Sequence, residues 1–269
     1  MRLEYKYLIP NEKLNDLRQA LIPFVNIDEY ALNRAQKEYT VRSIYYDTRK
    51  LDDYRDKLAG IKIRKKIRIR GYNELENESP VFLEVKRKYE NHISKNRSPV
   101  LYKNLNQILV SQDFDNLLIK KRNFPDERND AIKFFYLLKK NNCLPIILIV
   151  YEREALFSKY DSTLRITFDK NLRSFPFPKL SQLYEEKGLV SVFPRHFVLE
   201  IKFYSGFPKW LQNVISHFGL GRQAVSKYTT CIDNHEVYKK YVNRNKVLAP
   251  SLLNGTSNIY KDKWLKNAG

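Results

Sequence analysis

Cysteine is nearly absent from this chain, with only Cys143 and Cys231 among 269 residues. Two distant cysteines form neither a disulfide framework nor a CxxC ligand pair, and such usage fits a reducing cytosol. The 8 glycines and 11 prolines are too few for a collagen-like or Gly/Pro-rich low-complexity chain. The longest apolar run, residues 144–150, is far shorter than the roughly 20 residues that span a bilayer. The N-terminus carries charges where a signal peptide needs an apolar stretch. We therefore expect a soluble, cytoplasmic protein.

Several catalytic motifs are also missing. The sequence has no GxxxxGK[ST] pattern, which excludes a P-loop. The pattern GxGxxA occurs at residues 219–224, but it follows a predicted helix where a dinucleotide-binding loop follows a strand. The four histidines lack metal-ligand spacing, and no Ser/His/Asp or Cys/His set is evident. Covalent catalysis by a standard nucleophile is therefore not indicated.

Positive charge, in contrast, is abundant. The chain has 49 Lys and Arg against 30 Asp and Glu, a formal net charge of +19, and 43% of its residues are hydrophobic. The hydrophobic content is enough for one large folded domain or two small ones. The charge indicates an anionic partner, which at this level could be a nucleic acid, an acidic membrane surface or a polyanionic small molecule.

Periodicity predicts a single α+β domain over residues 1–236, rich in strands, followed by a basic, partly disordered tail over residues 237–269. Strands are predicted at 2–9, 40–46, 61–72, 81–89, 144–157, 163–169 and 197–204, and helices at 11–21, 47–58, 126–141 and 208–218. Residues 91–125 give no clear pattern beyond some helix, and the tail carries seven basic residues against the single acidic residue Asp262.

The most informative feature is the alternation of charge within the predicted strands. In residues 61–70 every even position is Lys or Arg, and every odd position except Lys65 is Ile. Because successive side chains of a strand point to opposite faces, one face is apolar and the other carries five cations about 7 Å apart. Such neighbours repel each other unless open water or a polyanion lies among them.

Other predicted strands repeat this alternation. Glu and Lys stand two residues apart at Glu4 and Lys6, and the same pair recurs at 84/86 and 200/202. One interpretation is a sheet whose charged face meets bulk water. The alternative is a sheet curled into an antiparallel eight-stranded β-barrel with helices packed outside, whose charged faces line a tunnel. The repeated bias to Lys and Arg on separate strands favours the tunnel, which requires paired charges or a bound ligand and metal.

A tunnel of this kind suits phosphate chemistry. Arg and Lys bind phosphate oxygens, and Glu offers oxygen ligands for Mg²⁺ or Mn²⁺. Together they can hold a phosphate chain in line, screen its charge and polarise it, which phosphoryl transfer requires.

An ordered series of short motifs resembles the VTC domain, the polyphosphate polymerase branch of the triphosphate tunnel metalloenzyme (CYTH-like) superfamily. The motifs are RLEYKYLI at 2–9, VRSIYYDT at 41–48, KIRIRGY at 66–72, VFLEVK at 81–86, YER at 151–153, RITFD at 165–169, VLEIK at 198–202 and SKY at 226–228. The resemblance implies an ATP-dependent polymerase that transfers the γ-phosphate of ATP to a growing polyphosphate chain inside an eight-stranded tunnel, with Mn²⁺ or Mg²⁺.

The resemblance also implies roles for individual residues. Those expected to contact phosphates during catalysis are Lys6, Arg68, Arg70, Lys86, Arg153, Arg165, Lys202 and Lys227. Further substrate-binding residues would be Tyr151, Ser226, Arg42, Glu4 and Glu84, and Glu200 would be the metal ligand. The superfamily opens with ExExK, whereas this chain has Arg2 at the first position, which favours the polymerase branch over hydrolytic triphosphatases.

The expected partners are ATP, inorganic polyphosphate and a phosphate or pyrophosphate primer. We expect neither an N-terminal SPX regulatory domain nor a C-terminal membrane segment, so if polyphosphate is exported or regulated, a membrane-protein partner would supply that part and could hold the domain at the inner face of the membrane. Three alternatives stay open: a metal-dependent triphosphatase of the same fold, a non-catalytic polyphosphate or inositol-phosphate sensor, and a nucleic-acid-binding protein. Because no RRM, KH or zinc-finger pattern occurs, no nucleic acid is expected.

Overall fold

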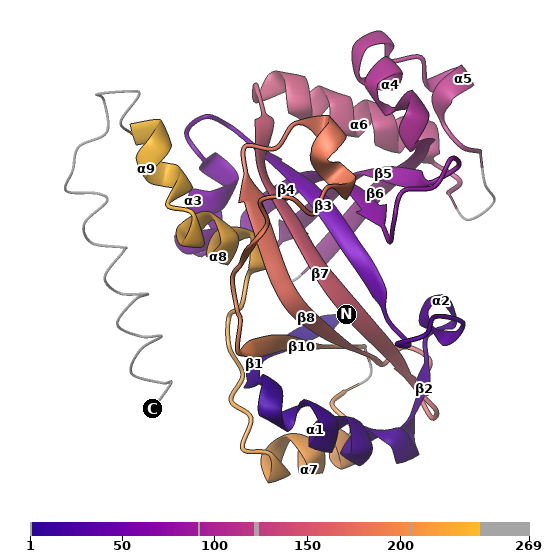
Figure 1. The fold of residues 1–269 in the computed structure, drawn as a ribbon, viewed down its shortest axis with the longest axis vertical. Helices are drawn as coiled ribbons and strands as arrows, with labels where there is room; N and C mark the ends of the chain where they lie inside the picture. The colour runs from indigo at the N-terminus through magenta and orange to yellow at the C-terminus, as the bar shows by residue number, and fades with distance from the viewer. Residues whose placement is uncertain (1, 91, 121–123, 205, 243–269) are drawn as a thin grey trace. The chain divides into compact units, whose positions relative to one another are not determined.

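The computed structural model describes residues 2–90, 92–120, 124–204 and 206–242 (Figure 1). The strands are β1 (Leu3–Pro10), β2 (Val25–Ile27), β3 (Tyr39–Asp47), β4 (Ile63–Tyr72), β5 (Pro80–Tyr89), β6 (His92–Leu101), β7 (Leu144–Ser158), β8 (Arg165–Pro176), β9 (Val190–Ser191) and β10 (His196–Phe203). The α-helices are α1 (Leu14–Leu21), α2 (Glu29–Leu32), α3 (Asp52–Leu58), α4 (Leu105–Ser111), α5 (Phe114–Leu117), α6 (Glu127–Lys140), α7 (Lys209–His217), α8 (Lys227–Asn234) and α9 (Val237–Val242).

The chain separates into two compact units, residues 1–235 and 236–269. The first unit holds every strand and α1 to α8, and the second unit contributes α9 to the described residues. The predicted disorder of the tail concerns mainly residues 243–269, which lie outside the described residues. No helix in the described part of the chain is long and apolar enough to cross a bilayer.

The predicted α+β class and antiparallel sheet are confirmed. One sheet contains all ten strands, and eight of them follow one another in the order β1-β10-β8-β7-β3-β4-β5-β6. The short strands β2 and β9 are attached to β7 and β8. Every pairing is antiparallel, from Lys6 opposite Glu200 in β1–β10 to Lys66 opposite Lys86 in β4–β5.

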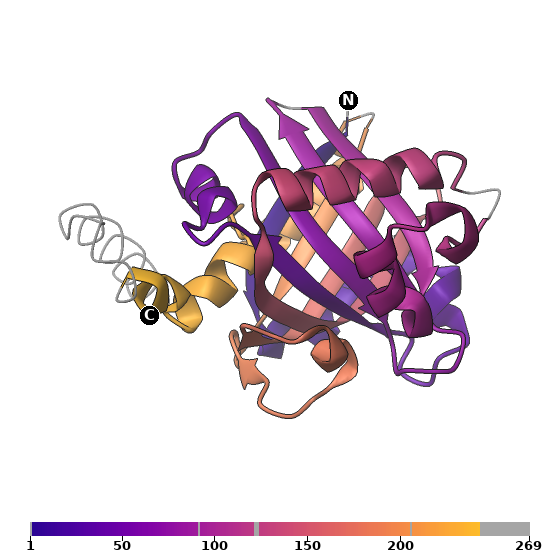
Figure 2. The same cartoon turned by 90° about the horizontal axis from the view of Figure 1, so that it is seen from above.

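The prediction of a closed β-barrel is wrong at the backbone level. β1 and β6 are the two ends of the strand order, and no ladder joins them within the described ranges. One reason lies at β1, where the backbone N–H of Gln223 donates to the carbonyl oxygen of Lys6 at 2.8 Å. The loop before α8 therefore occupies part of the edge that closure would need. The sheet still curls strongly, so that the indigo and orange strands lie behind the purple ones in Figure 2.

Helices cover the apolar, outer face of the curled sheet. Phe134 and Phe135 of α6 pack on Ile67, Ile69 and Leu83, all of them buried. The end of the sheet formed by β1 and β10 is covered in the same way by α1 and α7, which lie side by side in Figure 1. Because the apolar residues of each strand point to these helices, the alternating Lys, Arg and Glu residues point to the opposite, inner face.

Residues 91–125, for which the sequence indicated no regular strand, contain β6. This strand pairs with β5 along its whole length, from Pro80 opposite Leu101 to Tyr89 opposite His92. Its first half is polar and exposed, so it lacks the apolar alternation that marks a strand. The hairpin nevertheless places Lys95 opposite Lys86 and Arg97 opposite Glu84.

Candidate active site

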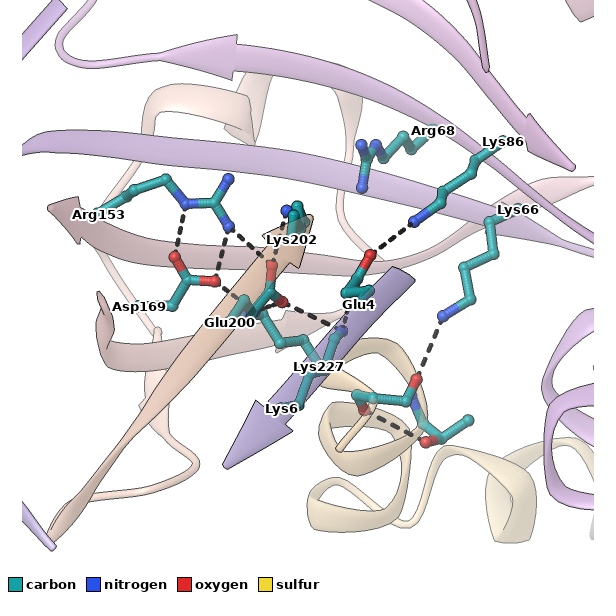
Figure 3. A network of polar contacts seen from close by, with 12 residues as sticks. Glu4, Lys6, Lys66, Arg68, Lys86, Arg153, Asp169, Glu200, Lys202 and Lys227 are labelled. Atoms are coloured by element: carbon teal, nitrogen blue, oxygen red, sulfur yellow. Dashed lines mark hydrogen bonds and ion pairs between the residues drawn. The ribbon is translucent and has the colours of Figure 1, made fainter. Parts of the chain in front are cut away.

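Glu200 of β10 lies at the centre of the inner face. Its carboxylate lies 2.7 Å from Lys227 Nζ, 3.0 Å from Lys202 Nζ, 3.1 Å from Lys6 Nζ and 3.5 Å from Arg153 Nη2. These cations come from α8, β10, β1 and β7, and Figure 3 shows all four directed at the one carboxylate. The predicted convergence of cations from separate strands is therefore present in the structure.

The strand register explains why these groups meet. Lys6 stands opposite Glu200, and Glu4 stands opposite Lys202, in adjacent strands. Glu200 and Lys202 share a face because they are two residues apart, while Leu199 and Ile201 point to the covering helices. The Glu-x-Lys repeat in β1 and β10 thus produces alternating charges across the pair, the arrangement that opposite-charge cross-strand pairs favour.

Asp169 of β8 provides a second buried carboxylate beside Glu200. It accepts two hydrogen bonds from Arg153, at 2.5 and 2.7 Å, and forms an ion pair with Lys227. The ring of Tyr151 lies under both cations, with its centroid 5.2 Å from Arg153 Cζ and 5.0 Å from Lys227 Nζ. Arg153 and Lys227 are therefore held in place on two sides, by a carboxylate and by an aromatic face.

A second carboxylate centre forms around Glu84 of β5. Arg68 Nε donates to its carboxylate at 2.7 Å, and Lys95 Nζ and Arg97 Nε each lie 3.0 Å from it. Glu84 is only 1% exposed. The neighbouring Arg70 is buried too, with Nε donating to Ser43 Oγ at 3.0 Å.

Glu4 connects the two halves of the inner face. It lies 3.0 Å from Lys6 on its own strand and 3.7 Å from Lys86 on β5. Next to Lys86, the Lys66 ammonium donates to Ser226 Oγ at 3.2 Å and lies over the Tyr228 ring. Side chains of β1 and β5 thus meet across the inner face, although β1 and β6, the two ends of the sheet, are not paired through their backbones in the described ranges.

Fourteen side chains make up this inner cluster. Ten are cations, Lys6, Lys66, Arg68, Arg70, Lys86, Lys95, Arg97, Arg153, Lys202 and Lys227, and four are carboxylates, Glu4, Glu84, Asp169 and Glu200. The formal surplus is six positive charges. Most of these groups are largely removed from water, although the Lys86 and Lys95 side chains stay 39% and 42% exposed, so the surplus is a source of repulsion that an anion would relieve.

The pKa directions show the same imbalance. Burial would raise the pKa of Glu200, but Lys227, Lys6 and the other nearby cations hold that pKa well below its usual range. For Lys202, burial lowers the pKa to about 8, and attraction to Glu200 offsets this only in part. For Lys66, burial and then the neighbouring Lys6 and Lys86 hold the pKa well below its usual range. The carboxylates thus remain charged, while some lysines are short of counter-charge.

Most residues predicted from the sequence are brought together here. The cluster contains seven of the eight predicted phosphate-contacting cations, Lys6, Arg68, Arg70, Lys86, Arg153, Lys202 and Lys227, together with Glu4, Glu84 and Glu200. Tyr151 and Ser226 contact its members directly. Their roles with a bound substrate stay predictions.

Two predicted residues lie apart from the cluster. Arg42 shares the outer face of β3 with Ile44, pairs with Glu186 and donates from Nε to the Asn73 carbonyl at 2.8 Å. Arg165 shares the inner face of β8 with Asp169 and stands opposite Lys202, but its guanidinium pairs with Asp28 at 2.7 Å. Arg42 therefore points away from the inner face, whereas Arg165 lies on that face without joining the ion pairs of the cluster, and the roles of both with a bound substrate stay predictions.

Four members were missing from the predicted set of site residues. Lys66 lies two residues before Arg68, and Asp169 lies two residues after Thr167, in strands whose charge alternation the sequence shows. Because residues two apart on a strand share a face, the alternation could have identified both. Lys95 and Arg97 lie two residues apart in β6, where the strand itself was not predicted. Their Lys-x-Arg spacing is the sequence feature that could have indicated two cations on one face of a strand.

The carboxylates can be tested against the expected Mn²⁺ or Mg²⁺. In the residues that the structure describes, no group of three or more His, Cys, Asp or Glu could hold a metal by itself. Glu4 and Glu200 do approach each other, since Lys6 Nζ lies 3.0 Å from one and 3.1 Å from the other. Mg²⁺ in phosphoryl-transfer sites is commonly held by one or two carboxylates plus substrate phosphates. Glu200 and Glu4 fit that requirement if phosphate oxygens complete the coordination.

Comparison with known proteins places the chain in a family. Residues 1–235 match the family model described as "VTC domain". No curated protein matches the sequence. Among solved structures, the one described as "Structure of PH1819 protein from Pyrococcus Horikoshii OT3" is similar at 12% identity and a TM-score of 0.43, covering 86% of this chain and 99% of that one. A likeness of that strength carries no argument about function. The family match spans the whole first unit, and the chain belongs to the VTC domain family.

Proposed function

We propose that this protein synthesises inorganic polyphosphate by transferring the γ-phosphate of ATP to the end of a polyphosphate chain. The observation that carries the proposal is the surplus of six positive charges in the inner cluster, held mostly on paired β-strands, in a chain of the VTC domain family. A linear polyanion supplies the negative charge that the cluster lacks. The cations also come from opposite sides of the curled sheet, so a chain lying between them would be contacted along its length.

The reaction needs no covalent intermediate on the protein. A terminal oxygen of the polyphosphate chain, or of a phosphate or pyrophosphate primer, attacks the γ-phosphorus of ATP. The bond between that phosphorus and the β–γ bridging oxygen breaks, ADP leaves with the bridging oxygen, and the chain is one phosphate longer. Catalysis then depends on alignment of the two anions and on stabilisation of the charge that builds up.

The residues of the inner cluster fit these two tasks. Arg153 and Lys227 are fixed by Asp169 and by the Tyr151 ring, so they offer donors that need little reorganisation when a phosphate arrives. Lys66, which has no carboxylate partner among the described residues, and Lys202 would screen the anionic reactants. When bound, Mn²⁺ or Mg²⁺ would polarise phosphate oxygens, with Glu200 and Glu4 as its protein ligands.

Pure protein incubated with ATP and Mn²⁺ tests the proposal, with the products separated on a gel stained for polyphosphate. We expect long chains, and we expect Lys202→Gln to abolish them because it removes an inner cation. Lys103→Gln is the matched control, since Lys103 is exposed and pairs with Glu78 away from the cluster. Release of orthophosphate alone would instead indicate a triphosphatase. Absence of turnover despite tight binding of tripolyphosphate would indicate a sensor.

The expected cytoplasmic location and membrane-protein partner stay proposals of the same kind. Co-purification of the protein with membranes, and its loss from them after removal of one integral membrane protein, would support such a partner.

A further inference from the structure

Three consecutive residues at the beginning of α8 contact the inner cluster. Ser226 Oγ accepts a hydrogen bond from Lys66 Nζ at 3.2 Å, and Lys227 pairs with two carboxylates of the cluster. The ring of Tyr228 faces the Lys66 ammonium, with its centroid 5.3 Å from Nζ. Because Lys66 has no carboxylate partner in the described part of the chain, its position depends on these contacts with α8. The first turn of α8 therefore supplies one cation of the cluster, Lys227, and holds a second one.

The hydroxyl of Tyr228 anchors this turn to the end of β3, where it donates to the carboxylate of Asp47 at 2.6 Å. Asp47 is fully buried, and it accepts three further hydrogen bonds, from the backbone N–H groups of Thr48 at 2.7 Å and of Asp53 and Tyr54 at 3.0 Å. The last two groups belong to the first turn of α3. Since backbone donors fix its carboxylate, Asp47 gives Tyr228 an acceptor that does not move.

The ring of Tyr228 has a second fixed neighbour. It stacks on the Tyr45 ring, with centroids 5.1 Å apart, and the Tyr45 hydroxyl accepts a hydrogen bond from Arg68 Nη1 at 2.7 Å. Burial and the nearby Asp47 carboxylate raise the pKa of Tyr228 well above its usual range, so its hydroxyl stays protonated and donates. Tyr228 thus connects a rigid anchor at the end of β3 with cations of the inner cluster.

Another hydrogen bond joins α3 to the opposite end of α8. There the Tyr54 hydroxyl donates to the Asp233 carboxylate. Asp233 lies five residues beyond Tyr228, which is about 7.5 Å along a helix. Within the described residues no ion pair or hydrogen bond links Asp233 to the inner cluster. Two similar hydrogen bonds therefore hold α8 against α3, and only one of them is formed by the turn that carries Lys227.

We propose that Tyr228 is a positioning residue for phosphate binding, whose hydrogen bond to Asp47 fixes the first turn of α8 so that Lys227 and Lys66 stay where a phosphate chain meets them. Lysine side chains have many rotamers, and ordering them when an anion arrives weakens binding. A turn that is already anchored avoids much of this loss. The inference rests on the proposed function only in taking the inner cluster as the phosphate-binding site.

The test is a double-mutant cycle measured by calorimetric titration with tripolyphosphate. Tyr228→Phe removes the hydroxyl and keeps the ring, and it is introduced into the native protein and into a background that carries Lys66→Gln and Lys227→Gln. Tyr54→Phe is the matched control, because it removes the same group from the other hydrogen bond between α3 and α8. Thermal unfolding of every variant is recorded in parallel.

In the native background we expect Tyr228→Phe to weaken tripolyphosphate binding about tenfold, since two cations must then be ordered by the anion itself. Without the two lysines the same change should alter the affinity by less than about twofold, because the groups through which Tyr228 acts are gone. Tyr54→Phe should lower the Tm by a similar amount as Tyr228→Phe does, yet keep the affinity within about twofold of native. A role in stability alone would not produce this dependence on the lysines.

Several results would overturn the inference. Equal losses of affinity in the two backgrounds, or an equal loss for Tyr54→Phe, would mean that the hydroxyl supports the fold without acting through Lys66 and Lys227. Native affinity in Tyr228→Phe would mean that the turn keeps its place without the anchor. Asp47→Asn weakens the same hydrogen bond from the acceptor side, and it takes the place of Tyr228→Phe in the cycle if that variant does not fold.

The outcomes also separate this inference from the proposed function. If the native protein synthesises polyphosphate and Tyr228→Phe binds tripolyphosphate as the native protein does, only the positioning role fails. If the native protein binds tripolyphosphate without elongating any chain, the proposed function fails and the cycle still decides the positioning role. A native protein that does not bind tripolyphosphate would contradict both.

Discussion

Replacement of Glu200 by Gln removes the carboxylate that four cations share. The side chain keeps its size, so the main change is the loss of one negative charge from a site that is 5% exposed. Removing one partner of a buried charge pair costs about 3–5 kcal/mol, because the remaining charges stay buried without compensation. A domain of this size loses about 2–4 °C in Tm per kcal/mol, so we expect the Tm to fall by about 6–20 °C.

Anions should reverse much of this loss. In the native protein Glu200 occupies the cations that a phosphate would contact, so its removal leaves Lys202 without its carboxylate partner and Lys227 with Asp169 as its remaining one, and both can bind an anion. A ligand at one hundred times its Kd stabilises by about 2.7 kcal/mol. Metal-free tripolyphosphate at such a concentration should therefore restore about 5–10 °C to Glu200→Gln. We expect the variant to bind it more tightly than the native protein while losing ATP turnover.

The assay is thermal unfolding with and without tripolyphosphate, together with direct titration by calorimetry. Glu186→Gln is the matched control, because Glu186 also contacts two arginines, Arg42 and Arg173, but lies half exposed on the outer face. Because the Glu186 carboxylate itself lies in water and the buried Arg42 keeps its hydrogen bond to the Asn73 carbonyl, this control should cost much less stability than Glu200→Gln. If Glu200→Gln were as stable as Glu186→Gln and bound tripolyphosphate no better, Glu200 would not lie in a desolvated cationic cluster.

Two further predictions concern pH and packing. The pKa of Lys202 is about 8 and that of Lys95 about 7, so both lysines lose their protons as the pH rises through those values. Above them, the two lysines must take up protons again when an anion binds. Affinity for tripolyphosphate should therefore fall between about pH 7 and 9, and calorimetry in buffers of different ionisation enthalpy should detect the proton; a flat profile would contradict the charge imbalance. Phe134→Ala in α6 should destabilise the protein by about 3–5 kcal/mol in urea unfolding, since Phe134 is fully buried, and a loss under about 1 kcal/mol would mean that α6 does not cover the sheet.

Alternation of charge was enough to predict much of the site. In β4 the even positions are basic and the odd ones mainly Ile, and the structure buries Ile67 and Ile69 under α6 while Arg68 and Arg70 point inward. This succeeds because a strand has a strict two-residue period, so one covered face determines the direction of every side chain.

The same rule does not decide how strands close into a barrel. Closure depends on which backbone groups meet at the sheet edges. Here Gln223, near the other end of the chain in sequence, donates a backbone hydrogen bond to the edge of β1. Local periodicity carries no information about such a contact. β6 was missed for a related reason, because its polar first half becomes a strand through pairing with β5 and not through its own pattern.

Residues outside clear alternation were the hardest to place. In β3 both faces are buried, so nothing in the sequence around Arg42 distinguishes the inner face from the outer one. Lys227 reaches Glu200 from the first turn of α8, and only the resemblance to the VTC domain indicated a role for it. Its position depends on tertiary packing of α8 against the sheet, which strand parity cannot predict.

The most direct measurement of the central claim is a crystal structure of the native protein grown with tripolyphosphate. We predict an anion inside the curled sheet, with phosphate oxygens in contact with Lys202, Arg153 and Arg68 at once. Tripolyphosphate bound only on the exterior, with the inner cations still paired solely to their own carboxylates, would contradict the claim that these strand faces form a phosphate-binding site.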